Sequence, residues 1–197
     1  MTTSSSALLL ADRVVLITGA TGGLGAPIAR ACAAEGATVV LHARVVRKLE
    51  ALYDEIVAAG HPEPVILPLD FAKAEASDFA NVANALESQF QRLDAIVHTA
   101  AMLGSLGPLE HQSFDNWVNL LRVNVAAYIE TAYNVALPAL RAMLKQPFRQ
   151  GALSRGRIVT VTAGSSRDPA PGRGLFGVVK AGVNILMRAI AREHKAD

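Results

Sequence analysis

The sequence lacks the cysteines that a disulfide-stabilised protein would need. Its 197 residues include one cysteine, Cys32, which lies in a stretch of alanines and apolar residues. A lone cysteine cannot form an internal disulfide, so nothing here predicts an oxidising compartment. We expect Cys32 to pack in the core as a small apolar side chain rather than to act as a nucleophile.

Targeting and membrane signals are also lacking. Residues 1–10 have no basic start, and their apolar run ends at Asp12 and Arg13, unlike a signal peptide. No run of about twenty apolar residues is available to cross a bilayer. The sequence therefore predicts a cytoplasmic protein with no membrane partner.

Charged and aromatic side chains are sparse. They make up 18% and 5% of the chain against 51% hydrophobic residues, which excludes a disordered protein. Basic residues gather late in the sequence, without the interleaved aromatics of a base-stacking surface. A nucleic-acid surface and a solvated helix end both fit this pattern, and we expect the second, with no nucleic-acid partner. We also expect no metal site. These basic residues are Arg141, Lys145, Arg149, Arg155, Arg157 and Arg173.

Short apolar strands alternate with helical patterns along the chain. The strands are rich in β-branched residues without polar alternation, which is typical of strands buried on both faces of a parallel sheet. This order predicts an α/β fold, a Rossmann-type doubly wound parallel sheet in three α/β/α layers. Strands are predicted at 14–17, 38–41, 65–69, 94–98 and 157–162, and helices up to residue 35, at 46–59, up to about 91, and at 112–122, 124–145 and 175–194. We expect a loose arm over residues 1–11 and one nucleotide-binding domain over 12–197.

A glycine-rich turn joins the first strand to the first helix. It reads Thr-Gly-Ala-Thr-Gly-Gly-Leu-Gly over residues 18–25. Gly19 permits the tight turn, Gly23 the close approach of a pyrophosphate to the helix end, and Gly25 the packing of helix on strand. The strand–turn–helix context predicts a dinucleotide site, and a flexible loop without a ligand is the alternative.

The spacing Gly-x-x-x-Gly-x-Gly after a threonine resembles the short-chain dehydrogenase/reductase family, over about residues 12–195. The resemblance implies a nicotinamide cofactor and an oxidoreductase acting on a carbonyl or secondary alcohol. It also implies a homodimer or homotetramer, formed by the helices matching 112–145 and 175–194. The implied cofactor contacts are Thr18, Gly19, Thr21, Gly23, Leu24, Gly25 and Ala100.

The end of the second strand indicates which cofactor is bound. A carboxylate there would favour NAD, but Ala43 stands at this position and Arg44 follows it. A guanidinium suits the 2′-phosphate of NADP(H), and His42 or Arg47 is a candidate to add to it. Arg44 could instead end the strand in water. Asp70 matches the family position beside the adenine, or it is the N-cap of the next helix.

Two of the four catalytic positions that the resemblance implies are filled. Asn124 and Lys180 match the family asparagine and lysine, and Lys180 is also implied to contact the cofactor. Phe176 stands at the tyrosine position and Ala163 at the serine position. A phenyl ring has no ionisable proton, so it cannot replace a phenol as general acid.

Other hydroxyl groups near these positions are weaker candidates. Ser165 and Ser166 could reach in from the loop after the fifth strand, and Tyr128 lies one helical turn after Asn124. The segment His98-Thr99-Ala100-Ala101 also departs from the family's Asn-Ala-Gly ending, and we expect His98 to be structural.

The sequence thus predicts an NADP(H)-binding, short-chain dehydrogenase/reductase-like protein with impaired turnover. The alternative is an inactive nucleotide-binding regulatory or scaffold module. Family members continue for two more strands and a substrate lid, so we expect the sequence ending at Asp197 to lack that part.

Overall fold

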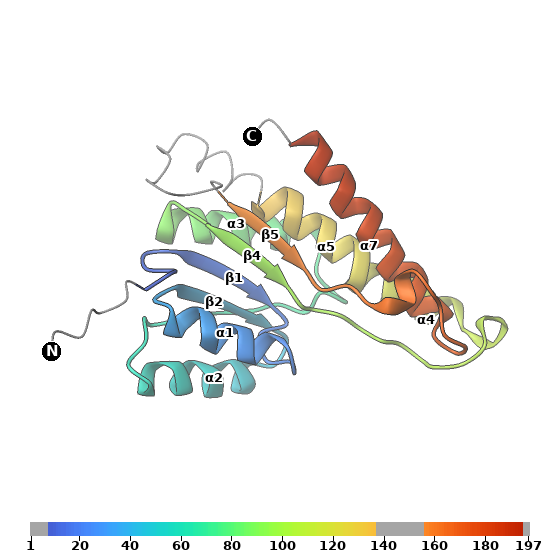
Figure 1. Ribbon diagram of the computed structural model, residues 1–197, viewed down its shortest axis with the longest axis horizontal. Coiled ribbons are helices and arrows are strands. Elements are labelled where there is room, and N and C mark those ends of the chain that lie inside the picture. Colours follow the sequence, from blue (N-terminus) through green and yellow to red (C-terminus); the bar gives the residue numbers. More distant parts are fainter. Residues whose placement is uncertain (1–7, 137–155, 195–197) are drawn as a thin grey trace, which may run out of the picture.

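A computed structural model describes residues 8–136 and 156–194, and these are arranged around one five-stranded sheet (Figure 1). All neighbouring strands are parallel, in the order β3-β2-β1-β4-β5. Their bounds are β1 Val14–Thr18, β2 Thr38–Ala43, β3 Val65–Pro68, β4 Ala95–His98 and β5 Arg157–Thr160. Every residue of β1 is buried because the strand is central and both faces are covered.

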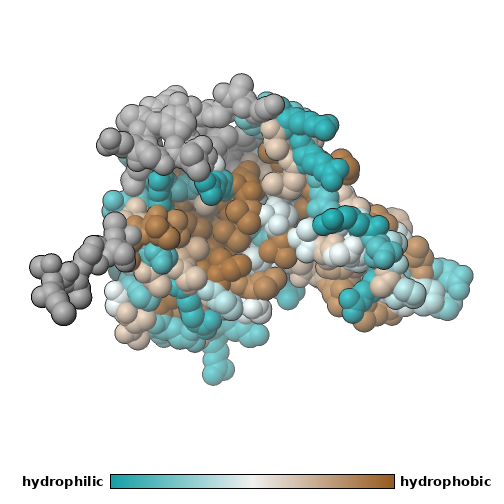
Figure 2. Space-filling view, viewed as in Figure 1, coloured by the Kyte–Doolittle hydropathy of each residue, from teal (hydrophilic) through white to brown (hydrophobic). Residues whose placement is uncertain are grey.

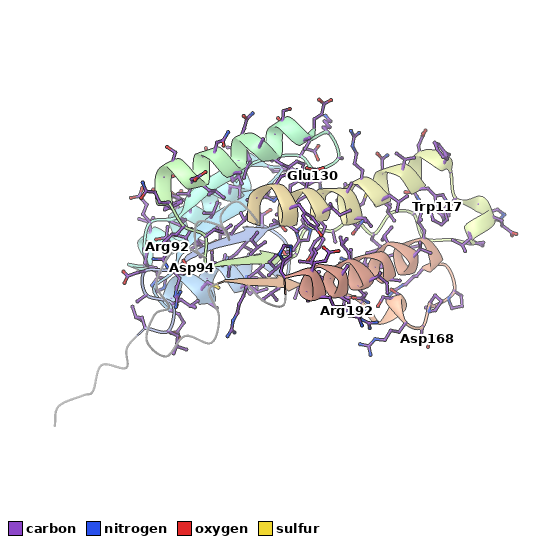
Figure 3. All side chains as sticks on the ribbon, turned by 90° about the horizontal axis from the view of Figure 1, so that it is seen from above. Arg92, Asp94, Trp117, Glu130, Asp168 and Arg192 are labelled. Carbon is purple, nitrogen blue, oxygen red and sulfur yellow. The ribbon has the colours of Figure 1, made fainter. Side chains whose placement is uncertain are left out.

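Helices cover both faces of this sheet. On one face, α1 (Gly25–Ala34) and α2 (Val46–Ala58) pack on the odd-numbered residues of β1, such as Ile17. On the other, α3 (Ala76–Phe90) packs on Leu16. The helices α4 (Phe114–Leu121), α5 (Ala127–Glu130) and α7 (Gly174–Glu193) complete the molecule, with α5 and α7 side by side (Figures 1 and 3). The predicted three-layer Rossmann-type fold is confirmed.

The expected break between helices at 122–124 is wrong. Helical backbone continues from α4 through α5, with π-helical turns at Arg122–Ala126 and Thr131–Ala136. The Asn124 Nδ2 donates to the carbonyl of Leu120, four residues earlier, at 3.0 Å. This bond takes a carbonyl that the backbone of an α-helix would use, so the helix widens here instead of ending. The part of the predicted helix beyond residue 136 lies outside the described residues, as do Arg141, Lys145, Arg149 and Arg155.

Part of the expected N-terminal arm is held in place. Within residues 8–11, the amide of Leu10 donates to the carbonyl of Glu35 at 2.9 Å, and the amide of Leu9 donates to the Glu35 carboxylate at 3.1 Å. The expectation of a loose segment is therefore wrong for these residues, because the end of α1 satisfies their backbone groups.

An ion cluster at the amino ends of the strands fixes β1 against β4. Asp94 accepts hydrogen bonds from the Arg13 and Arg92 side chains, each at 2.8 Å, and from the amide of Val14 at 2.9 Å. Arg92 and Asp94 lie side by side in Figure 3. Since this end is occupied by structural ion pairs, the opposite, carboxyl end of the sheet is left for a ligand.

Among the described helices, α7 is the one long and apolar enough to cross a membrane by length and composition alone. Its residues Leu175, Val179, Val183 and Ile190 are buried against the rest of the protein. Ile185 is 64% exposed, and the pairing of this helix across a two-fold axis stays a prediction. Figure 2 shows further hydrophobic surface in the hollowed middle of the face in view.

Candidate nucleotide-binding and active site

A cavity of about 420 Å³ opens at the carboxyl ends of β1, β2, β3 and β4. Its position is the crevice where open α/β sheets bind ligands, since the chain crosses to opposite sides of β1 here. Of the predicted cofactor residues, it brings together Gly19, Thr21, Arg44, Asp70 and Ala100. The other lining residues are Gly22, His42, Ala43, Val45, Lys48, Phe71, Thr99, Ala101, Met102 and Val123.

The glycine turn is packed too tightly for side chains at two positions. Gly19 has a φ of +69°, and a Cβ there would lie 2.8 Å from the backbone nitrogen of Ala100. A Cβ on Gly25 would lie 2.1 Å from the carbonyl oxygen of Gly19. Glycine is required at both places because the clashing atoms are backbone. The turn is therefore closely packed backbone at the start of α1, where the helix dipole favours an anion.

Threonine hydroxyls join this turn to the end of β4. Thr99 Oγ1 donates to the carbonyl of Thr18 at 2.6 Å, and the amide of Ala100 donates to Thr18 Oγ1 at 3.3 Å. Thr99 thus bridges the two strands at the position where the family resemblance implied an asparagine amide. Thr18 itself is buried and supports the turn without lining the cavity.

Like Thr18, the predicted cofactor residues Gly23, Leu24 and Gly25 lie outside the cavity lining. Gly25 is buried beneath the turn, Leu24 is 58% exposed, and a Cβ on Gly23 would meet nothing within 4 Å. Gly23 is therefore open to a ligand approaching from the surface, while Gly25 acts through packing. Their contact with a cofactor stays a prediction.

Two cations face the cavity after β2. Arg44 was expected there, and Lys48, in the first turn of α2, was not considered. Neither forms an ion pair with a described residue, and no side chain caps the start of α2 at Val45. Arg47, the other candidate, is exposed and does not line the cavity. Free cations beside uncapped helix amides form a site for an anion.

His42 lines the cavity but does not add a positive charge. It is 3% exposed, and burial lowers its pKa to about 4, so the ring is neutral at pH 7. The expectation that His42 adds a charge to bind the 2′-phosphate is therefore wrong. The desolvation of a buried imidazolium outweighs the raising effects of Leu69 and Asp70 on this pKa.

Asp70 is not the N-cap of the next helix. Its carboxylate accepts from the amide of Ala72 at 3.1 Å and closes a local turn. The cap of α3 is Glu75, which forms a reciprocal capping box with Asp78. Asp70 therefore remains available at the cavity wall beside Phe71.

Asn124 and Lys180 are both buried near the end of β5. Asn124 Nδ2 donates to the carbonyl of Met102 at 2.9 Å, and its Oδ1 accepts from the amide of Met102 at 3.3 Å. Lys180 is 4% exposed, and its Nζ donates to the carbonyl of Val161 at 3.2 Å. Burial lowers the pKa of this amine. Asn124 thus fixes the segment after β4, and Lys180 the segment after β5.

The side chains beside Lys180 offer no acidic hydroxyl. The ring centre of Phe176 lies 5.6 Å from Lys180 Nζ, and Ala163 has a methyl group in place of the implied serine. Ser166 is engaged elsewhere, since its hydroxyl donates to the carbonyl of Ala163 at 2.7 Å and accepts from Asn184 at 2.8 Å.

Tyr128 does not replace the implied phenol. It is 1% exposed, and its hydroxyl contacts Thr160 Oγ1 at 2.7 Å and the sulfur of Met187. Burial raises its pKa, which makes it a poorer acid at neutral pH. Tyr128, the weaker candidate for the proton donor, is thus a packed core residue.

A row of aromatic rings lies beneath the cavity. His42 stacks on Phe71 with ring centres 4.1 Å apart, Phe71 lies 6.1 Å from His98, and His98 meets Tyr128 edge-on at 4.7 Å. Neither ring nitrogen of His98 has a hydrogen-bond partner among the described residues. Burial first, and then the charges of Lys180 and His42, lower the pKa of His98 to about 3.

We expect the protein to lose stability in mild acid. Unfolded histidine has a pKa near 6.5, whereas the folded values for His42 and His98 are about 4 and about 3. Below pH 6.5 the unfolded chain binds more protons, so stability falls as the pH falls. From pH 8 to pH 5 the two histidines together remove about 4 kcal/mol from the free energy of unfolding. Denaturant titrations at pH 8 and pH 5 measure this change in the free energy of unfolding. A His98→Leu variant should lose about half as much stability between the two pH values. A free energy of unfolding that does not change with pH would contradict the prediction.

Comparisons with known proteins agree with this geometry. The model of the family described as short chain dehydrogenase matches residues 13–197. The uncharacterized oxidoreductase YciK of Escherichia coli K12 is 27% identical over 187 residues, which are 95% of this chain and 70% of the relative.

Two solved structures are similar over nearly the whole chain. A short chain dehydrogenase from Pseudomonas syringae is 33% identical, with a TM-score of 0.86, over 98% of this chain and 74% of the other. Another, from Escherichia coli CFT073, was solved in complex with NADPH. It is 27% identical, with a TM-score of 0.86, over 96% of this chain and 74% of the other. Together with the match to the family model, these similarities show that the chain belongs to the short chain dehydrogenase family.

Proposed function

We propose that this chain binds NADP(H) and that its oxidoreductase activity on carbonyls or secondary alcohols is slow or absent. The observation that carries the first part is the pair of unpaired cations, Arg44 and Lys48, in the wall of the cavity. The second part rests on Phe176 and Ala163, which place no acidic hydroxyl beside Lys180.

The cavity residues fit the pyrophosphate and the phosphorylated adenosine half of a dinucleotide phosphate. The turn at Gly19 and Gly22 and the start of α1 would hold the pyrophosphate. Arg44 and Lys48, with the uncapped start of α2, would hold the 2′-phosphate, and Asp70 and Phe71 would line the adenosine end. Related structures complexed with NADP and with NADPH support this choice of cofactor.

The residues near Lys180 would do little chemistry on a substrate oxygen. A bound NADPH supplies a hydride, and a carbonyl must also gain a proton. Phe176 has none to give, Ala163 donates no hydrogen bond, and the amide of Asn124 is used by Met102 and Leu120. The Lys180 ammonium can donate a proton, but it is turned toward the carbonyl of Val161. Without a positioned acid the rate falls by about a hundred- to ten-thousand-fold.

A second candidate function is a nucleotide-binding regulatory or scaffold module. Phe176 favours it, since this side chain occupies the proposed proton-transfer position with a ring that can only pack. The two functions share the cofactor and differ in turnover. They are separated by titrating NADPH and NADH against the protein by nucleotide fluorescence, and then testing NADPH oxidation with a panel of aldehydes and ketones. Tight NADPH binding without oxidation supports the module, and failure of both nucleotides to bind contradicts both functions.

The preference for NADPH over NADH should depend on the two cavity cations. Replacing Arg44 and Lys48 together by alanine removes charge-assisted bonds to the 2′-phosphate, each equivalent to about a tenfold or larger change in affinity. We expect NADPH affinity to fall about a hundredfold and NADH affinity to change little. Arg47→Ala is the matched control, because Arg47 is a neighbouring cation outside the cavity. Equal losses for both nucleotides would point to damage of the turn instead.

A further inference from the structure

One buried side chain connects the ends of three neighbouring strands. His42, in β2, accepts at Nδ1 from the amide of Gly19 at 3.4 Å, just after β1. Its Nε2 lies 3.1 Å from the carbonyl oxygen of Leu69, just after β3. The ring also stacks on Phe71, with centres 4.1 Å apart. No cation or substrate role accounts for these contacts.

The two partners determine the protonation state of the ring. The amide of Gly19 can only donate, so Nδ1 must be without a proton. The carbonyl of Leu69 can only accept, so Nε2 must carry the proton. The neutral Nε2–H imidazole is therefore the one form that satisfies both, and burial of the ring favours the neutral form.

The partner on the turn, Gly19, is the one residue of the segment 18–25 with a positive φ. Gly19 has a φ of +69° and touches the backbone of Ala100. Its carbonyl accepts from the amide of Gly22 at 2.9 Å, and the next amide, of Ala20, donates to the carbonyl of His42, also at 2.9 Å. The backbone and the ring of His42 thus hold the turn at adjacent residues.

We propose that His42 is a positioning residue for the nucleotide, whose imidazole fixes the Gly19 peptide in the conformation that a pyrophosphate needs. This inference rests on the proposed NADP(H) binding. The acceptor at Nδ1 carries the positioning role, and the donor at Nε2 ties β2 to β3 without touching the turn. The two nitrogens therefore have separable effects.

Two substitutions separate these effects. In His42→Asn, Oδ1 stands as many bonds from the backbone as Nδ1 and can accept from Gly19. In His42→Gln, Nε2 stands as many bonds away as the imidazole Nε2 and can donate to Leu69, but nothing accepts from Gly19. Both variants lose the ring stack on Phe71, so each is the control for the other in folding stability.

The readouts are the NADPH dissociation constant and hydrogen exchange of the peptide over residues 17–24 in the nucleotide-free protein. We expect the glutamine variant to bind NADPH about tenfold more weakly, from its unpaired amide, and the asparagine variant to stay within about threefold of the parent. Exchange in the turn should accelerate in the glutamine variant alone.

Equal dissociation constants and equal exchange in the two variants would overturn the proposal, as would a glutamine variant indistinguishable from the parent. If the parent protein does not bind NADPH, yet exchange separates the variants as expected, the proposed function fails and the role of His42 in holding the turn stands.

Discussion

Replacing Phe176 by tyrosine and Ala163 by serine together is expected to produce NADPH-dependent carbonyl reduction at least a hundredfold above the parent rate. A positioned general acid contributes about a hundred- to ten-thousand-fold, and a hydroxyl donor to the developing oxyanion about a hundred- to a thousandfold. The two effects act on one oxygen atom, so they are not expected to multiply fully. The measurement is NADPH oxidation with simple aldehydes and ketones at saturating cofactor.

The structure explains why this substitution needs little rearrangement. Phe176 is partly exposed and already lies beside Lys180, whose Nζ is 5.6 Å from the ring centre. An ammonium at this place lowers the pKa of a phenol toward neutrality. Lys180→Met in the double variant is therefore expected to abolish most of the gained rate while NADPH binding persists. A parent protein that already reduces carbonyls as fast as the double variant would show that another group delivers the proton.

Replacing Gly25 by alanine is expected to abolish measurable NADPH binding. The new methyl would lie 2.1 Å from the carbonyl oxygen of Gly19 and 2.8 Å from the Cα of Ala20. Both are backbone atoms of the turn, so α1 must move away from the sheet and the close packing of the turn is lost. Overpacking of this kind destabilises by about 1–3 kcal/mol or more. Nucleotide fluorescence and denaturant unfolding measure the two consequences.

Gly23→Ala is the matched control for this prediction. A methyl at Gly23 meets no atom within 4 Å, so the free energy of unfolding should stay close to that of the parent. Its NADPH affinity should fall only if a phosphate approaches the backbone there. Gly25→Ala with parent-like affinity would contradict the packing argument, because no side chain is available to yield.

Local sequence patterns were sufficient for the architecture. The apolar β-branched runs predicted all five strands, although only β1, β2 and β4 lie inside the sheet and the edge strands β3 and β5 are partly exposed. Gly36 and Gly60 marked helix ends through their positive φ. The one break predicted inside a helix, at 122–124, was wrong. There, a side-chain bond from Asn124 to Leu120 widens the helix, and that geometry has no signature in hydrophobic periodicity.

The candidate site was predicted only where its residues sit at strand ends. Gly19, Arg44, Asp70 and Ala100 follow successive strands, and parallel strands bring their carboxyl ends to one edge. Lys48 was missed because it belongs to a helix, and its direction depends on how α2 sits on the sheet. The signal that could have found it is its place in the first turn of the helix predicted at 46–59, directly after the second strand.

The sequence alone therefore determined the fold class, the glycine-rich turn and the family, because each depends on residue types at short, fixed spacings. Only the tertiary structure decided the charge state of His42 and His98, the bond of Lys180 to Val161 and the packing of Tyr128. Those properties arise from desolvation and from partners far away along the chain. Both exist only once the layers have packed, because burial sets whether a group is charged and packing sets which atoms it meets.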